Sequence, residues 1–424
     1  VSMTINGNYW WHLAAFFRVA QRQQIRIFAK ENGREPDPTE VEEIKAFTLS
    51  NVRGTVQADQ LKEAMGQNTL VFNLDTSLRM MGDVAEFYVN NSIRNHYFVS
   101  ISGYHIAEAG ANPITQAALT LANGLTYVEL FKARGLNPDK FLRNFSWFFS
   151  NGMDPEYVVI GRVARRIWSI AMREMYNVGE RGQKLKYHIQ SSGRSLHAQE
   201  YTWNDYRTTL QALYALADNA NSLHTNSRDE AFGTPTEETV RDAVAIQLIL
   251  SKEYGLLQNE NPLQGSHITT WLTENVEGQI LKIFEEMNRR GGVLGSLEVN
   301  YQRNRIQDES MIYEHRKHTG DIPIIGVNTF QDPDSKSLSA DEADSFDLDV
   351  TRSDGDEKRM VILRNEDFRK RHAKEAEIGI ERLKNTAREG GNLFEVMMDI
   401  VEYCTVGQVT EALFETGGQF RRNM

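Results

Sequence analysis

The chain has 424 residues, a mass of 48.5 kDa, a hydrophobic content of 40% and a formal net charge of −11. This length allows one large domain or two to three ordinary ones, with ample apolar residues for a core. The acidic balance argues against a general nucleic-acid-binding protein, because neutralising phosphates requires clustered Lys and Arg.

Membrane and secretory signals are not found in the sequence. There is no run of about 18 apolar residues, and residues 1–4 carry neither a basic leader nor a signal-peptide core. A soluble, cytoplasmic protein without a membrane partner is therefore expected. The single cysteine, Cys404, cannot form a disulfide within the chain and is predicted to be a buried structural thiol.

Short runs rich in β-branched and aromatic residues recur along the first half of the chain and predict buried parallel strands. They lie at residues 1–5, 54–59, 98–102, 145–150, 185–190 and 221–226. Helix-length amphipathic stretches separate them. Alternation of this kind predicts a parallel sheet, either doubly wound or closed into a barrel.

Two of the helices carry clear end signals. Apolar residues from Ile114 to Val128 recur at intervals of three or four on one helical face, and Gly135 is placed to end that helix. Further along, Thr234 offers an N-cap, Pro235 a first helical residue and Glu237 a capping-box carboxylate. A helix is therefore predicted to start at this point.

Polar residues that could carry chemistry stand at or just after the predicted strand ends, which favours the barrel. They are Gln57 and Asp59, Tyr104 and His105, Ser150 and Asn151, His188 and Gln190, and His224 and Asn226. In a (β/α)8 barrel such ends converge at one mouth. We therefore expect an α/β fold, a (β/α)8 TIM-type barrel that is N-terminally incomplete, with about six of its eight strands.

The second half of the chain is predicted to be mainly helical. Helices are expected at 271–290, 364–388 and 391–416, with a short extended piece at 322–328. Acidic and serine residues dominate 331–357, which is predicted to be a solvated linker. The expected organisation is a partial barrel at 1–240, a helical continuation packed on it at 241–330, the linker at 331–357 and a C-terminal helical segment at 358–424.

The segment SISGYHIAEAGAN at residues 100–112 carries the most informative chemistry. A buried strand gives way there to Tyr104 and His105, with Glu108 one helical turn later. An imidazole in such a place can hydrogen-bond a substrate carbonyl or move a proton. A purely structural histidine is the alternative of equal weight.

Two later strands repeat a polar arrangement, because His188 and Gln190 point to one face and His224 and Asn226 do the same. These side chains could line a polar barrel mouth. A protein-bound metal is not expected, since no pair has the spacing of a recognised site.

Arg53, Arg181 and Lys186 lie beside predicted strands, and such cations suit phosphate oxygens. The residues alone therefore indicate a barrel enzyme that acts on a polar or phosphate-bearing substrate. They leave the reaction open.

Long collinear motifs cover nearly the whole chain. They are VSMTING, VRGTVQADQLKEAMGQNT, SISGYHIAEAGANPITQ, FFSNGMDPEY, RVARRIW, KYHIQSSGRSLHAQE, NSLHTNSRDEA and ALFETGGQFRRNM. In these motifs the chain resembles the adenosylcobalamin-dependent acyl-CoA mutases of the methylmalonyl-CoA mutase superfamily, and within them the C-terminal mutase region of fused isobutyryl-CoA mutases. The resemblance implies an isomerase with a radical mechanism, started by homolysis of the cobalt–carbon bond, that rearranges isobutyryl-CoA to n-butyryl-CoA.

The resemblance also implies residue roles. His105 would hydrogen-bond the thioester carbonyl, with Tyr104 packed beside it, and Glu108 and Glu230 would contact the adenosyl ribose or the corrin side. The positions implied for acyl-CoA binding are Arg53, Thr55, Gln57, Gln67, Tyr97, Ser146, Arg181, Lys186, His188 and Gln190. These roles require one cavity at the carboxyl mouth of the sheet to gather Gln67, His105, Ser146, His188 and Glu230.

Gln67 would select the acyl group. Methylmalonyl-CoA relatives carry an arginine at the matching position, which pairs with the substrate carboxylate, and a neutral glutamine cannot supply that charge-assisted pair. Arg194, which stands where those relatives carry a Trp, points the same way. An uncharged acyl group is expected, and another acyl-CoA, branched or hydroxylated, is the alternative.

Parts of the family pattern have no counterpart in the sequence as given. They are the first two strands, the cobalamin-binding domain with its DxHxxG motif and the GTP-binding chaperone domain of fused members, and bulky residues at 8–11 replace an expected small turn. We therefore expect one part of a larger or split enzyme that binds acyl-CoA, is inactive alone and works with a cobalamin-binding domain or subunit.

The same resemblance implies the remaining partners. GTP and Mg2+ would enter only through a GTPase chaperone domain, and Glu298 and Asn423 match positions near its nucleotide. A homodimer is also implied. The non-enzyme alternative is a truncated, inactive mutase fragment that serves as a binding or scaffold subunit.

Overall fold

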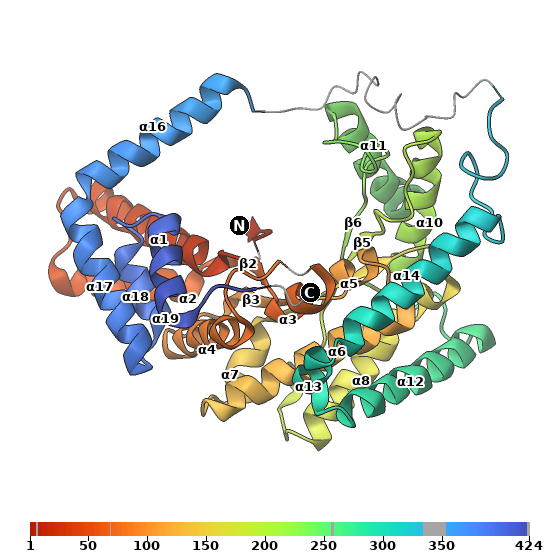
Figure 1. Cartoon of the computed structure of the whole chain (residues 1–424), viewed down its shortest axis with the longest axis horizontal. Helices are drawn as coiled ribbons and strands as arrows, with labels where there is room; N and C mark the ends of the chain where they lie inside the picture. The colour runs from red at the N-terminus through yellow and green to blue at the C-terminus, as the bar shows by residue number, and fades with distance from the viewer. Residues whose placement is uncertain (6, 68, 256–257, 334–352, 422–424) are drawn as a thin grey trace.

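The computed structural model describes residues 1–5, 7–67, 69–255, 258–333 and 353–421, and its centre is a curled, six-stranded parallel sheet (Figure 1). The strands are β1 (Ser2–Met3), β2 (Arg53–Ala58), β3 (Asn95–Ser102), β4 (Phe145–Asn151), β5 (Tyr187–Ser191) and β6 (Ser222–His224). They pair in chain order, β1 to β6. The six predicted strands are confirmed, and the fold is an incomplete TIM-type barrel followed by helices.

The strand register separates an apolar outer face from a more polar inner face. Along β4, Phe145, Trp147 and Phe149 are buried in the core, and the alternate residues point the other way. In-register pairing extends these inner positions across the sheet. One row contains Ser102, Phe148, His188 and Ser222, and the next contains Ser150, Gln190 and His224. The curled sheet thus presents hydroxyl, amide and imidazole groups on its inner side.

The main helices follow the strands and pack against the outer face or against one another. They are α1 (Tyr9–Asn32), α2 (Pro38–Asn51), α4 (Leu74–Asn90), α6 (Pro113–Ala133), α8 (Ile160–Glu174), α10 (Asn204–Ala217) and α11 (Glu237–Leu248). The helix predicted from Ile114 is α6, and Gly135 follows its end with a φ of +81°. At residues 8–11 a helix begins in place of the small turn expected there, and β1 has only two residues.

Short helical turns connect several of these elements. They are α3 (Gln60–Lys62), the π-helix η1 (Glu63–Gln67), α5 (Tyr104–Glu108), α7 (Pro138–Phe141), η2 (Leu142–Asn144), η3 (Pro155–Val158), α9 (Glu180–Gln183), η4 (Tyr201–Trp203) and the π-helix η5 (Ile249–Glu253). Two of them, η1 and α5, contact each other at the carboxyl ends of β2 and β3.

The later helices extend the barrel without forming a separate core. They are α12 (His267–Asn288), α13 (Gly292–Glu298), α14 (Tyr301–Thr319), α16 (Gly355–Arg371), α17 (Ala373–Glu389), α18 (Leu393–Ile400) and α19 (Val406–Gly417). α12 packs on α6 and α8, and α18 packs on α1 and α4. One hydrophobic cluster of the described residues runs from Tyr9 to Leu413 and includes Cys404, which is buried as predicted.

The helix boundaries in the C-terminal part differ from the predicted ones. The stretch 364–388 belongs to two helices, which meet at His372, and 391–416 contains α18 and α19. α16 begins at Gly355 because Asp354 and Glu357 form a capping box, so the end of the predicted linker is helical. Residues 334–352 of that linker lie outside the described residues. The domain limits expected at 240 and 357 fall within α11 and α16.

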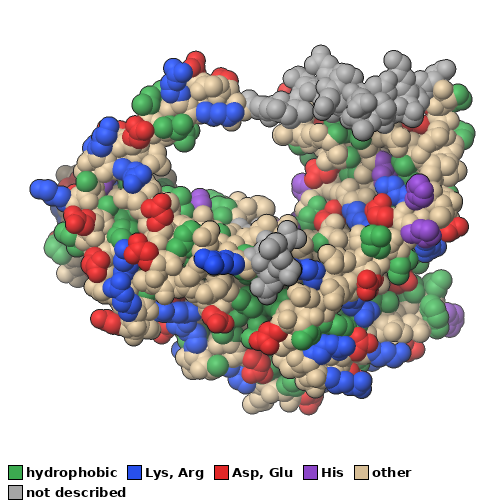
Figure 2. Space-filling model, viewed as in Figure 1, with side chains coloured by type: hydrophobic (Ala, Val, Ile, Leu, Met, Phe, Trp, Pro, Cys, Tyr) green, Lys and Arg blue, Asp and Glu red, His purple; other side chains and the backbone are tan. Residues whose placement is uncertain are grey.

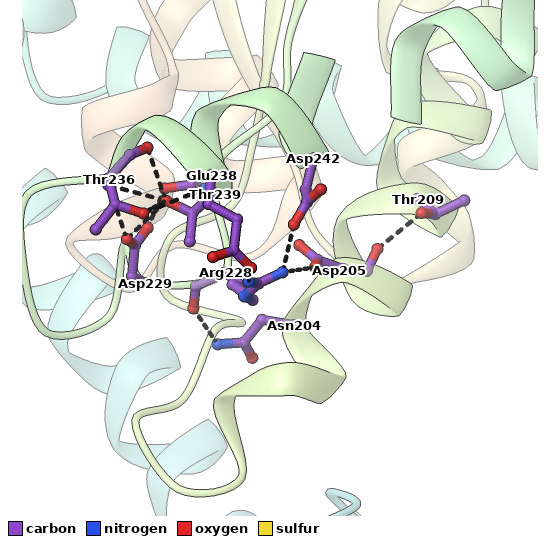
Figure 3. A network of polar contacts seen from close by, with 10 residues as sticks. Asn204, Asp205, Thr209, Arg228, Asp229, Thr236, Glu238, Thr239 and Asp242 are labelled. Carbon is purple, nitrogen blue, oxygen red and sulfur yellow. Dashed lines mark hydrogen bonds and ion pairs between the residues drawn. The ribbon is translucent and has the colours of Figure 1, made fainter. Parts of the chain in front are cut away.

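The predicted start of α11 is wrong by two residues, because Thr236 and not Thr234 is the N-cap. Thr236 Oγ1 accepts from Thr239 N at 3.3 Å, and Thr239 Oγ1 accepts from Thr236 N at 3.0 Å. A tertiary partner selects this arrangement. Asp229 Oδ2 accepts from Thr239 Oγ1 at 2.7 Å and from Thr236 N at 3.2 Å (Figure 3). The local sequence alone does not contain that contact.

Helix α16 carries an exposed apolar segment. This helix has no buried residue, and Met360, Val361, Ile362 and Leu363 are at least half exposed; Figure 2 shows hydrophobic side chains on it between charged ones. Across the described ranges, none of the helices has the length and apolarity needed to cross a bilayer.

The packing of α6 on β4 gives a first prediction. In Gly124→Ala the added Cβ would lie 2.2 Å from Cη2 of the buried Trp147, and overpacking of this kind costs about 1–3 kcal/mol. Gly278→Ala in α12 is the matched control, because nothing lies within 4 Å of its added methyl group. That control should gain roughly 0.5–1 kcal/mol. Chemical unfolding of the purified variants measures both effects, and equal midpoints would contradict the packing.

Candidate active site

The carboxyl ends of β3, β4 and β5 gather an aromatic and polar group around Phe148. The Tyr104 ring stacks on Phe148 with centroids 5.0 Å apart, and the His105 ring meets Phe148 edge-on at 6.0 Å. The His188 ring lies 5.2 Å from Phe148. Gln190 Nε2 donates to the Tyr104 hydroxyl at 3.1 Å. Three of the residues implied by the resemblance therefore contact Phe148, and a fourth, Gln190, contacts Tyr104.

His105 is held as a neutral imidazole. Its Nδ1 lies 2.6 Å from Ser102 Oγ. Burial, and then the positive charge of Lys62, lowers the pKa of His105 to about 3. In the tautomer in which the Ser102 hydroxyl donates to Nδ1, the proton is on Nε2. The side chain can therefore donate a hydrogen bond at neutral pH without carrying a charge.

A buried cluster of polar side chains is linked to His105 through Ser102. Asp59 accepts from Tyr127 Oη at 2.5 Å, from Ser102 N at 2.9 Å and from Lys62 N at 3.1 Å. Burial raises the pKa of Asp59, and these donors oppose that shift. Lys62 and Glu63 form an ion pair at 2.6 Å with exposed fractions of 0% and 1%. Asp59 was noted at a strand end in the sequence, but Lys62 and Glu63 had no predicted role.

The π-helix η1 places Gln67 beside His105. A Cβ added at Gly66 would lie 3.6 Å from the carbonyl oxygen of His105, so the two backbones are in contact. The Gln67 side chain is exposed and lies next to Glu63. π-Turns of this kind often occur at functional sites. The structure thus joins residues that are 38 positions apart in the sequence.

The two glutamates assigned to the cofactor differ in their surroundings. Glu108 Oε1 accepts from Ser192 Oγ at 2.9 Å and from Ser150 Oγ at 3.3 Å, and its Oε2 accepts from Arg194 N at 2.7 Å. Both carboxylate oxygens of Glu108 are therefore engaged within the chain. Glu230, on the loop after β6, is exposed.

The charges of these glutamates reach Tyr104. Burial first, and then the negative charges of Glu108 and Glu230, raises the pKa of the Tyr104 phenol. Tyr104 therefore remains a neutral hydroxyl group at any physiological pH.

An ionic clamp fixes the loop that carries Glu230 (Figure 3). Arg228 pairs with Asp242 at 2.5 Å, with Glu238 at 2.7 Å and with Asp205 at 3.2 Å. Asn204 Nδ2 donates to the Arg228 carbonyl at 2.9 Å. Nearby, Asn226 accepts from Gln190 at 2.9 Å and donates to the Ser191 carbonyl at 2.7 Å. The β6–α11 loop is thereby tied to the strand ends.

Three implied binding residues lie at the amino ends of the strands. Arg53 begins β2, Lys186 immediately precedes β5, and Arg181 belongs to α9; all three are exposed. Thr55 is in register with Tyr97, and alternation places Gln57 on the same face of β2 as Thr55. Gln57 is the penultimate residue of β2 and therefore stands near the strand end that carries Asp59.

Ser146 lies on the same face of β4 as Phe148 but nearer the amino end of the strand. It is the second residue of β4 and donates to the Val99 carbonyl at 3.3 Å. Phe148 follows two residues later, a rise of roughly 7 Å. That Ser146 shares one cavity with His105 stays a prediction.

Two further predictions fall outside this region. Glu298 is an exposed residue at the end of α13, and Asn423 lies outside the described residues. Within the part of the chain that the structure describes, no group of three or more His, Cys, Asp or Glu side chains is arranged to hold a metal ion.

Comparison with known proteins identifies the family of this chain. A family model described as methylmalonyl-CoA mutase matches residues 39–419. Fused isobutyryl-CoA mutases from Geobacillus kaustophilus and Nocardia farcinica are 58% and 56% identical to the chain over all of its length, and the chain spans 39% of the length of each. The 2-hydroxyisobutanoyl-CoA mutase large subunit of Aquincola tertiaricarbonis is 31% identical over 99% of the chain, which covers 70% of that subunit. The chain belongs to the methylmalonyl-CoA mutase family.

Proposed function

We propose that this chain is the catalytic part of an adenosylcobalamin-dependent acyl-CoA mutase that rearranges isobutyryl-CoA to n-butyryl-CoA. The observation that carries the proposal is the neutral His105 beside Tyr104 on the inner face of the half-barrel. Identity of 55–58% over the whole chain to proteins named fused isobutyryl-CoA mutase supports the substrate.

The acyl-CoA would lie along the inner face. His105 Nε2 would donate to the thioester carbonyl, and a neutral donor suits this role because it polarises the carbonyl without giving up its proton. The exposed cations Arg53, Arg181 and Lys186 would bind CoA phosphates at the amino ends of the strands. Between these ends, the positions for the rest of the ligand are Thr55, Gln57, Tyr97, Ser146, His188 and Gln190.

The carboxyl mouth fits the nucleoside part of adenosylcobalamin. An exposed carboxylate at Glu230 can accept from ribose hydroxyls, and the Tyr104 ring stacked on Phe148 forms an aromatic wall beside it. Glu108 would instead support this site by holding the backbone at Arg194, because both of its oxygens are already engaged. When bound, the cofactor supplies a carbon-centred radical by cobalt–carbon homolysis. The aromatic wall would keep water away from that chemistry.

Gln67 would favour an uncharged acyl group, because its amide offers no positive charge to a substrate carboxylate. The second candidate is a mutase for another acyl-CoA. The 31% identity to a 2-hydroxyisobutanoyl-CoA mutase subunit favours that alternative specifically.

The chain would act within a larger assembly. It spans 39% of two fused relatives, which supports a separate cobalamin-binding domain or subunit and a GTPase chaperone domain that binds GTP and Mg2+. A cytoplasmic homodimer belongs to the same proposal, with residues 1–240 as the substrate-binding barrel and the later helices as its support. An inactive scaffold subunit remains the non-enzyme alternative.

The role of His105 predicts a specific loss of activity. In the complete enzyme with adenosylcobalamin, His105→Ala should lower kcat for isobutyryl-CoA by about 10²–10³-fold, the usual effect of removing one donor to a reacting carbonyl. His315→Ala on exposed α14 is the control and should keep full activity. Chromatography of the two acyl-CoA isomers measures turnover, and unchanged kcat in His105→Ala would refute the proposal. The chain without its partners should show no turnover.

The ionisation of His105 predicts a pH dependence. Its pKa of about 3 lies below the ordinary value of 6.5, so between these values the unfolded chain binds a proton that the folded chain does not. The free energy of unfolding should therefore fall as the pH falls through this window. Imidazole ¹⁵N shifts of the purified protein should report a neutral His105 protonated on Nε2 at about pH 5, whereas the urea-unfolded chain titrates near 6.5. A folded-state midpoint near 6.5 would contradict the neutral donor.

A further inference from the structure

The ion pair between Lys62 and Glu63 lies next to Gln67, the residue proposed to favour an uncharged acyl group. Their charged atoms are 2.6 Å apart, and both side chains are almost completely buried. Thr69 Oγ1 also donates to Glu63 Oε2. Glu63 is the first and Gln67 the last residue of η1, so one π-turn contains both.

The Gln67 amide is oriented by the Glu63 carboxylate. The end of the amide that faces Glu63 lies 3.1 Å from both carboxylate oxygens, and a carboxylate only accepts hydrogen bonds. The NH2 group at this end makes two charge-assisted bonds. The opposite orientation gives one weaker contact, in which Lys62 Nζ donates to Gln67 Oε1 at 3.4 Å. Two bonds to a charged acceptor outweigh it, so the carbonyl oxygen of Gln67 faces away from Glu63.

Stability alone does not account for this pair. Moving two charges out of water is unfavourable, and well-packed apolar residues of similar volume are often as stabilising as a buried ion pair. The pair does supply something that apolar residues cannot. Lys62 balances the charge of Glu63, which lets a buried carboxylate persist as an acceptor beside Gln67.

We propose that Glu63 is a specificity-determining residue, which acts by fixing the Gln67 amide, and that Lys62 is the positioning residue that pairs with the Glu63 carboxylate. Gln67 then presents a carbonyl oxygen to the acyl group at a fixed distance from the thioester donor. A carbonyl oxygen repels a second carboxylate on the substrate and tolerates an alkyl group. This inference rests on the proposed function, because it concerns the acyl end of the same substrate.

The test needs a variant that folds. Glu63→Gln alone leaves the Lys62 charge buried without its partner, which strongly destabilises a fold, so the main variant is the double change Lys62→Met with Glu63→Leu. The matched control is Lys384→Met with Glu415→Leu, which removes a Lys–Glu pair of the same 2.6 Å length between α17 and α19. Chemical unfolding establishes that both double variants remain folded.

Coupling between residues gives the decisive measurement in the complete enzyme. Gln67→Ala should raise KM for isobutyryl-CoA about tenfold in the wild-type background, with a smaller change in kcat. In the Lys62→Met, Glu63→Leu background the same change should have almost no further effect, because Gln67 is no longer held. The ratio of kcat/KM for isobutyryl-CoA over methylmalonyl-CoA should also fall about tenfold in this background. Additive effects, or an unchanged ratio, would overturn the inference.

A second readout separates this inference from the proposed function. The side-chain amide protons of Gln67, assigned by their loss in Gln67→Ala, should be shifted downfield in the wild type and return to ordinary positions in the Lys62→Met, Glu63→Leu variant. If the wild-type enzyme does not isomerise isobutyryl-CoA, the proposed function fails. If it does and the amide signals and acyl preference are unaffected by the double change, only the role of Glu63 and Lys62 fails.

Discussion

The hydrogen bonds of the Asp59 carboxylate join the ends of two neighbouring strands, and the candidate site depends on them. Asp59 caps the turn after β2 through Lys62 N and holds the last residue of β3 through Ser102 N. Ser102 in turn orients the imidazole of His105. One buried acceptor therefore sets both the turn that leads to Gln67 and the orientation of the His105 imidazole. Tyr127 makes this possible by donating a third bond that helps to keep the carboxylate charged inside the core.

The inner face of the sheet carries titratable side chains, and burial keeps most of them neutral. His105 and His188 have lowered pKa values and Tyr104 a raised one, in each case mainly because of burial. The charged side chains near them are paired with other groups, as Lys62 is paired with Glu63. Such an arrangement suits a ligand that is bound through a carbonyl and apolar carbon atoms. Ionic contacts are left to the exposed cations at the opposite strand ends.

The six strands and the barrel class could be predicted because buried parallel strands leave continuous apolar runs between helical stretches. Features fixed by tertiary contacts could not be predicted. The N-cap of α11 depends on Asp229, and the π-turn after β2 depends on a lysine that is buried against Glu63. The family resemblance identified His105 and Gln67 as site residues, but it could not show that Ser146 lies near the amino end of β4. An apolar run in the sequence predicts a strand but does not give the position of each residue along it.

Helices from the second half of the chain also support the candidate site. Arg303 on α14 donates to the Ala64 carbonyl within η1 at 3.1 Å, and Ser310 on the same helix accepts from Arg194, whose backbone holds Glu108. One helix from the second half of the chain therefore supports both the Gln67 turn and the Glu108 loop. Without α14, the sheet would hold each of these turns only at the end that joins a strand. With α14 packed across them, the acyl side and the cofactor side of the proposed site are set by the same rigid element.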